Sequence, residues 1–172
     1  MLYFAYGSNL DPEQMKQRCP ESGVVGLASL ADHRVAFPRF SNDWGGGTAG
    51  VQLAHGQTTW GVLYELSDAD LGRLDEYEGF VAEGDQHNHY DREHVTVELV
   101  RPDDGSIPRK VRAWTYVARQ AHPAPPSRRY LDAMLTGARH HRLPEEYVAW
   151  LETIEAGEAG ESRAKGGGET SA

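Results

Sequence analysis

The sequence has one cysteine, no long apolar run and no excess of basic residues. Cys19 cannot form an intrachain disulfide, which favours a reducing, cytoplasmic setting. The net charge is −9, with 26 acidic and 17 basic residues, so binding to a nucleic-acid backbone is not expected. No apolar stretch has membrane-spanning length, and the N-terminus lacks the features of a signal peptide. The 172 residues predict one domain with a proper core.

The segment 67–79 is predicted to be a short helix with a carboxylate on its buried side. It begins with a serine, a good N-cap, and ends with a glycine, a good helix terminator. Leu71 and Leu74 are three residues apart and mark the buried stripe. Glu78 lies four residues beyond Leu74 on the same face, whereas Asp75 points elsewhere and can be solvated.

Glu78 is therefore the first candidate for chemistry. Burial raises the pKa of a carboxyl group, and so does the negative end of the helix dipole in the last helical turn. A carboxyl group of raised pKa suits a general acid or base near neutral pH. The alternative is a frayed helix end with a solvated Glu78.

A second candidate site follows the first predicted strand. Residues 1–6 form a short apolar, aromatic run, and a helix is predicted to begin after Asp11, which is followed by proline at the first helical position. The connection between them contains Gly7, Ser8 and Asn9. Such a loop can direct backbone N–H groups at an anion, with Ser8 and Asn9 adding side-chain donors. An ordinary strand-to-helix turn would use the same residues.

Together, the motifs Tyr6-Gly-Ser-Asn-Leu10 and Leu74-Asp-Glu-Tyr-Glu-Gly79 resemble those of the gamma-glutamylcyclotransferase family. Three further segments extend the resemblance over about residues 1–155, namely Trp60-Gly-Val-Leu-Tyr64, Ala124-Pro-Pro-Ser127 and Leu143-Pro-Glu-Glu-Tyr147. The resemblance implies a small mixed β-barrel with helices packed around it. It also implies conversion of a gamma-glutamyl compound to 5-oxoproline with release of the attached amine.

The resemblance also implies roles for individual residues. Glu78 would be the general acid and base, and no cofactor or metal would be needed, because the substrate's own α-amine is the nucleophile. The residues implied to bind the substrate are Tyr6, Gly7, Ser8, Asn9, Leu10, Tyr130 and Tyr90. Each tyrosine could alternatively be a core or rim aromatic whose hydroxyl finds a local partner.

The resemblance matches Tyr90 to the family tyrosine that follows the Glu-Gly element, but the connection before it departs from the family pattern and weakens that match. The segment Phe80–His89 looks longer than the family's usual connection, as if several residues were inserted. We expect this inserted segment to border the pocket for the leaving group.

Most of the remaining chain has the short apolar runs or alternation of β-strands. Val95, Val97 and Leu99, for example, share one face. Two more helices are predicted, over about 127–140 and 144–155. Strands are expected at 1–6, 24–30, 33–37, 48–53, 58–66, 92–100 and 110–117, with a turn at 103–105. These elements predict an α+β fold with a small mixed, partly closed β-barrel of about six to seven strands and three to four surrounding helices.

Three other patterns point to weaker alternatives. The glycine-rich run 45–50 matches a dinucleotide fingerprint in letters only, because it precedes a strand, and it is interpreted as a flexible loop near the pocket. His87 and His89, with His94 nearby, have no familiar metal-ligand spacing, so no metal site is predicted. Arg128 and Arg129 lie in the first turns of a predicted helix, where they could bind a carboxylate but are expected in solvent.

The sequence thus predicts a gamma-glutamylcyclotransferase-like domain over 1–156 and a disordered tail over 157–172. The expected partner is a small gamma-glutamyl substrate, and homodimerisation is implied only by family behaviour. Two alternatives stay open: a relative that removes a gamma-glutamyl group from a larger pathway intermediate, and a non-catalytic module that binds a small ligand or a protein.

Overall fold

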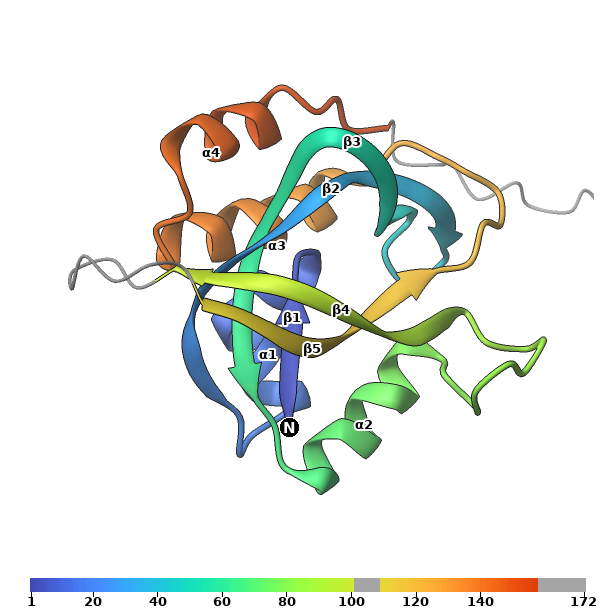
Figure 1. Cartoon of the computed structure of the whole chain (residues 1–172). Helices are drawn as coiled ribbons and strands as arrows, with labels where there is room; N and C mark the ends of the chain where they lie inside the picture. Colours follow the sequence, from blue (N-terminus) through green and yellow to red (C-terminus); the bar gives the residue numbers. More distant parts are fainter. Residues whose placement is uncertain (101–108, 158–172) are drawn as a thin grey trace, which may run out of the picture.

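The computed structural model describes residues 1–100 and 109–157, and a closed β-barrel forms its centre (Figure 1). Five strands follow one another around the barrel in the order β1-β3-β2-β4-β5. β1 pairs antiparallel with β3 and parallel with β5, so the sheet is mixed and has no free edge at this point. The strands are β1 (Leu2–Ala5), β2 (Gly23–Ser41), β3 (Gly46–Glu65), β4 (Tyr90–Val100) and β5 (Arg109–Ala118).

The predicted strand number and the predicted partial closure of the barrel are both wrong. The error in the strand number has a local cause. β2 and β3 each continue through a position where the sequence pattern breaks. Asp32 and Gly56 adopt positive φ values of 56° and 77° at these positions, and the Gly56 N–H donates to Asp32 Oδ1 at 2.8 Å. The pairing of the two strands resumes on the far side, with His33 opposite Leu53. The breaks are therefore matching irregularities of two long strands, and four predicted strands become two.

Four α-helices and one 3-10 helix surround the barrel in the described part of the chain, in agreement with the predicted helices. In Figure 1, α3 and α4 lie together on one side of the barrel and α2 lies on the other. None of the described helices has the length and apolar character needed to cross a membrane. The predicted turn at 103–105 and residues 158–172 of the predicted tail lie outside the described residues. The helices are η1 (Ser8–Leu10), α1 (Pro12–Arg18), α2 (Asp68–Glu78), α3 (Arg128–His140) and α4 (Glu145–Glu152).

The helix ends form where their capping residues predict them. The Asp11 carboxylate accepts hydrogen bonds from the first turn of α1, and the Ser67 and Ser127 hydroxyls accept from Asp70 N and Tyr130 N in the same way. Gly79 ends α2 in the left-handed conformation. These caps set where α1, α2 and α3 begin and where α2 ends.

Close packing of α3 on η1 holds the N-terminal loop in place. Leu10 and Met134 are fully buried in the core that the barrel shares with the helices. A Cβ atom on Gly137 would lie 2.1 Å from the backbone carbon of Leu10, so only glycine allows this approach. The loop that precedes α1 is therefore held by backbone contact with α3 as well as by its own hydrogen bonds.

We predict opposite effects for two Gly-to-Ala substitutions in helices. Gly137→Ala should lower the free energy of unfolding by about 3 kcal/mol, because its methyl group meets backbone that cannot move aside. Gly72→Ala should raise it by up to about 1 kcal/mol, because alanine is the better helix former and nothing lies within 4 Å of its Cβ. Denaturant unfolding of both variants checks this, and an equal change in both would contradict it.

Candidate active site

A cavity of about 720 Å³ lies where the N-terminal loop, the end of α2 and the start of β4 meet. Side chains from α1, from the β2–β3 hairpin and from the first turn of α3 complete its wall. The structure brings most of the predicted site residues together here, although they come from four separate parts of the chain. Those lining the cavity are Tyr6, Gly7, Ser8, Asn9, Glu78, Tyr90 and Tyr130.

Leu10 is the exception, and its predicted role in substrate binding is corrected. Its side chain is fully buried in the core and does not line the cavity. As the last residue of η1 it packs against α3, where Gly137 leaves room for it. Leu10 therefore anchors the loop and does not face a ligand.

Glu78 is largely enclosed, as its helical position predicts, and the frayed alternative is wrong. Its side chain is 13% exposed, and α2 remains helical up to this residue. Burial raises the pKa of the Glu78 carboxyl group, while the positive charge of Arg18 and a hydrogen bond from Asn9 partly oppose that rise. The site thus contains one carboxyl group that can exchange a proton closer to neutral pH than an exposed glutamate does.

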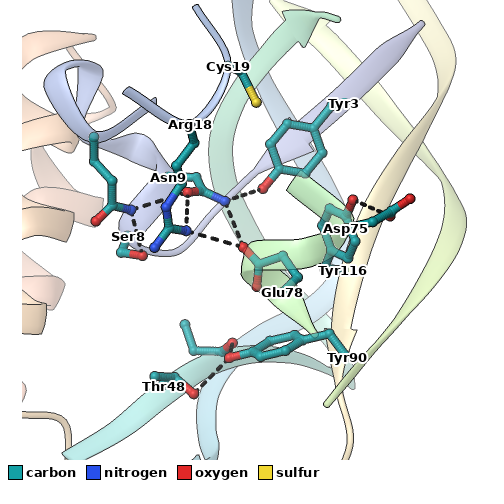
Figure 2. Close-up of polar contacts among 12 residues, drawn as sticks. Tyr3, Ser8, Asn9, Arg18, Cys19, Thr48, Asp75, Glu78, Tyr90 and Tyr116 are labelled. Atoms are coloured by element: carbon teal, nitrogen blue, oxygen red, sulfur yellow. Dashed lines mark hydrogen bonds and ion pairs between the residues drawn. The ribbon is translucent and has the colours of Figure 1, made fainter. Parts of the chain in front are cut away.

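The Asn9 carboxamide connects Glu78 to the rest of the loop (Figure 2). Its Nδ2 donates to Glu78 Oε1 at 2.9 Å and to the Tyr3 hydroxyl at 2.8 Å. Its Oδ1 accepts from Arg18 Nη1 at 2.8 Å and from Gln14 Nε2 at 3.2 Å. With donors and acceptor all engaged, the amide has one orientation, and it presents a hydrogen-bond donor to Glu78.

Arg18 is the most important residue that sequence reasoning missed. Its Nη1 lies 3.5 Å from Glu78 Oε1, and its guanidinium group stacks on the Tyr77 ring at 4.8 Å. One signal could have revealed it, because Gln14 and Arg18 are four residues apart and share the face of α1 that looks toward the loop. Sequence spacing says nothing, however, about which distant helix that face meets.

Two of the three predicted tyrosines have hydroxyl groups that hold the cavity wall together. The Tyr130 hydroxyl accepts from Ala49 N at 3.0 Å and from Ser8 N at 3.4 Å. A Cβ atom on Gly7 would lie 2.9 Å from that hydroxyl oxygen, so glycine is needed for this contact irrespective of any ligand. The Tyr6 hydroxyl donates to the Tyr116 carbonyl oxygen at 2.5 Å.

Tyr90 stands at the edge of the site on β4. Its hydroxyl donates to Thr48 Oγ1 at 2.7 Å and also reaches the Ala49 carbonyl oxygen at 3.2 Å. In the view of Figure 2, Tyr90 and Thr48 lie on one side of Glu78, and Asn9 and Arg18 lie on the other. Glu78 therefore has a loop side and a Tyr90 side within one cavity.

The helical pattern predicts a solvated Asp75, but in the structure its carboxylate has protein partners. Its carboxylate accepts from the Tyr116 hydroxyl and from Arg92 Nη1, both at 2.7 Å. Only Glu78 and Tyr77 of α2 line the cavity. Asp75 therefore binds α2 to the neighbouring strands and helps to hold Glu78 in position.

The inserted segment Phe80–His89 is tied to the barrel by its own polar contacts. Asn88 accepts from Val81 N at 2.7 Å and donates to Asp91 Oδ1 at 2.9 Å. Both oxygens of Asp91 accept from Arg119, at 2.6 and 2.8 Å. Only the last residue of the segment, His89, lines the cavity. The insertion thus borders the site much less than its length predicts.

The three histidines in and after this segment lie in different surroundings. His87 contacts the Asp85 carboxylate at 2.9 Å, and the His89 ring lies directly over Gly79. His94 stacks on Trp114 with ring centroids 3.4 Å apart. In the described part of the chain no three His, Cys, Asp or Glu side chains are grouped as metal ligands.

The glycine-rich run differs from its predicted state, whereas Arg129 is exposed as predicted. Gly46 and Gly47 belong to β3 and are not part of a flexible loop; a Cβ on Gly47 would meet the Ala124 carbonyl oxygen. Arg129 is exposed but lines the cavity, with its guanidinium group 4.7 Å over the Trp44 ring and hydrogen-bonded to the Asp43 carbonyl oxygen. The hairpin and α3 thus form one wall.

Comparison with known proteins identifies relatives along nearly the whole chain. The AIG2-like family model matches residues 58–151. A mouse protein named gamma-glutamylcyclotransferase is 33% identical over 91% of this chain and 80% of its own length. The human protein of the same name is 33% identical over 90% of this chain and 78% of its own length.

A solved structure has the same fold. It is titled gamma-glutamyl cyclotransferase and superimposes with a TM-score of 0.81 at 30% identity, covering 92% of this chain and 89% of its own. The sequence match and the fold match each cover about nine tenths of this chain. This chain belongs to the gamma-glutamylcyclotransferase family.

Proposed function

We propose that this protein is a gamma-glutamylcyclotransferase that releases 5-oxoproline and a free amine or amino acid from a gamma-glutamyl substrate. The observation that carries the proposal is Glu78, a buried carboxyl group of raised pKa that borders the cavity. The names of the relatives support the same reaction class.

The proposed reaction is an intramolecular acyl transfer. The α-amine of the substrate attacks its own γ-carbonyl carbon, so a new C–N bond closes the five-membered ring. The amide bond to the leaving group then breaks. Glu78 takes the proton that the α-ammonium group loses and delivers a proton to the departing nitrogen. No water is consumed and no cofactor is needed, because the nucleophile belongs to the substrate.

The enzyme's main task would be to fold the substrate. Holding the α-amine against the γ-carbonyl in a near-attack geometry can supply several kcal/mol of the barrier, and on the order of 7 kcal/mol in well-oriented intramolecular reactions. The loop Gly7–Asn9, fixed by Tyr130 and Leu10, would bind either the substrate α-carboxylate or the developing oxyanion. The rigid loop supports this role, since a preorganised donor loses little entropy on binding.

Arg18 would set the protonation state of Glu78. Burial raises the pKa of Glu78 and favours its protonated form, whereas a nearby cation favours its ionised form. Arg18 and Asn9 together therefore balance the burial of Glu78 in the direction that a base requires. Arg18 is a positioning and tuning residue in this proposal, because its contacts are with Glu78 and Asn9.

The alternative substrates have less support. A pathway-specific enzyme for a larger intermediate would need residues 80–89 to border the leaving group, but only His89 of that segment lines the cavity. A non-catalytic binding module would have no need for a buried carboxyl group at position 78. We therefore retain small gamma-glutamyl compounds as the proposed substrates.

We predict that Glu78→Gln abolishes release of 5-oxoproline, with a loss in kcat of about 10²-fold to 10⁴-fold, the range for removal of a general acid–base group. Glu76→Gln is the matched control, since Glu76 lies two residues earlier on α2 and is exposed. It should retain wild-type turnover. Release of 5-oxoproline from gamma-glutamylalanine measures both. Full activity in Glu78→Gln would remove Glu78 as the proton carrier.

We further predict that Arg18→Gln moves the rising limb of the pH profile of kcat/KM to higher pH. The positive charge of Arg18 lowers the pKa of Glu78, so its loss lets burial raise that pKa further, and a base must be ionised to act. Lys16→Gln removes the same charge from an exposed position on α1 and should leave the limb in place. A shift to lower pH in Arg18→Gln would contradict the assigned role.

A further inference from the structure

We infer that Arg39 binds a carboxylate on the leaving group and is the residue that discriminates gamma-glutamyl amino acids from gamma-glutamyl amines. This inference rests on the proposed function and extends it to the half of the substrate that leaves. It assigns a specificity-determining role to a residue that neither of the two site motifs contains.

The arginines that line the cavity differ in the partners of their guanidinium groups. Arg18, Arg39 and Arg129 line the cavity. Arg18 is occupied by Asn9 and Glu78. Arg129 donates to the Asp43 carbonyl oxygen and lies over the Trp44 ring, contacts that hold its guanidinium group against the hairpin. In the described part of the chain, the Arg39 guanidinium group has no hydrogen-bond or ion-pair partner, so it is available for a ligand.

The backbone of Arg39 is linked to Tyr90 through Thr48. Thr48 Oγ1 donates to the Arg39 carbonyl oxygen at 3.1 Å and accepts from the Tyr90 hydroxyl at 2.7 Å. The backbone of Arg39 thus lies on the Tyr90 side of the cavity. The side chains of Arg39 and His89 both line the cavity, and the positive charge of Arg39 adds to the effect of burial in lowering the pKa of His89.

The proposed reaction determines which half of the substrate lies next to Glu78. The gamma-glutamyl half, which carries the α-amine and α-carboxylate, must reach Glu78 and the loop Gly7–Asn9. The leaving group then extends toward the Tyr90 side, where Arg39 lies. A partly exposed guanidinium group offers a planar pair of donors that matches a carboxylate. An amino acid leaving group has that carboxylate and a simple amine lacks it.

The side chain of Arg39 can be replaced without breaking the strand that bears it. β2 pairs with β3 through backbone groups here, with Arg39 opposite Thr48. The contact of Thr48 with Arg39 also uses the backbone carbonyl. Arg39→Gln should therefore keep the cavity wall and remove only the charge and the fork of donors.

The test compares two substrates that differ by one carboxylate, gamma-glutamylalanine and gamma-glutamylethylamine. We expect wild type to prefer the alanine compound. In Arg39→Gln the ratio of the two kcat/KM values should fall roughly tenfold to a hundredfold, the range for loss of a hydrogen bond to a charged group. Arg39→Lys should give an intermediate ratio, because it keeps the charge but loses the fork.

Because the ratio is taken within each variant, a partly unfolded preparation does not change it. Arg34→Gln is the matched control, since Arg34 is an exposed arginine on the same strand outside the cavity wall, and it should keep the wild-type ratio. An unchanged ratio of the two kcat/KM values in Arg39→Gln, whether both values fall together or neither changes, would overturn the role of Arg39. It would leave the proposed function in place. Failure of wild type to release 5-oxoproline from either compound would overturn the proposed function itself.

Discussion

The hydrogen bond from Asn9 to Glu78 is the contact on which the site depends. A carboxyl group that is 13% exposed would be a poor base if burial acted alone, because desolvation favours its protonated form. Asn9 and the neighbouring Arg18 supply the opposing electrostatic effect, and Asn9 can do so only because both ends of its amide are engaged. The chemistry of the site is therefore set by a balance between burial and a few oriented donors.

The barrel brings two segments that are distant in the sequence into that contact. β1 lies between β3 and β5 and delivers the loop at its end to the cavity, while α2 follows directly after β3. Caps at both ends of α2 and the contacts of Asp75 fix its last turn. Glycine at Gly7 and Gly137 lets the loop approach α3 and Tyr130 more closely than any side chain would permit. Rigid backbone contacts of this kind are what preorganised catalysis requires.

Charge is distributed unevenly within the cavity. On the Asn9 side, Arg18 lies against the Glu78 carboxyl group. On the Tyr90 side, the Arg39 guanidinium group has no protein partner among the described residues. Partial burial of a cation without a partner costs free energy, and an anionic ligand that pairs with the cation would offset that cost. The same enclosure that raises the pKa of Glu78 would strengthen the attraction of Arg39 for an anionic leaving group.

Local chemistry in the sequence determined much of this protein. The caps of α1, α2 and α3, the buried face that carries Glu78 and the loop Gly7–Asn9 all follow from short-range rules, because each depends on neighbours within about one helical turn. Only the tertiary structure decided the rest: the closure of the barrel, the continuation of β2 and β3 through Asp32 and Gly56, and the burial of Leu10. It also decided that Arg18 meets Glu78 and that Arg39 does not. Those outcomes depend on which distant surfaces come together, and a pattern with a period of two or 3.6 residues contains no information about that.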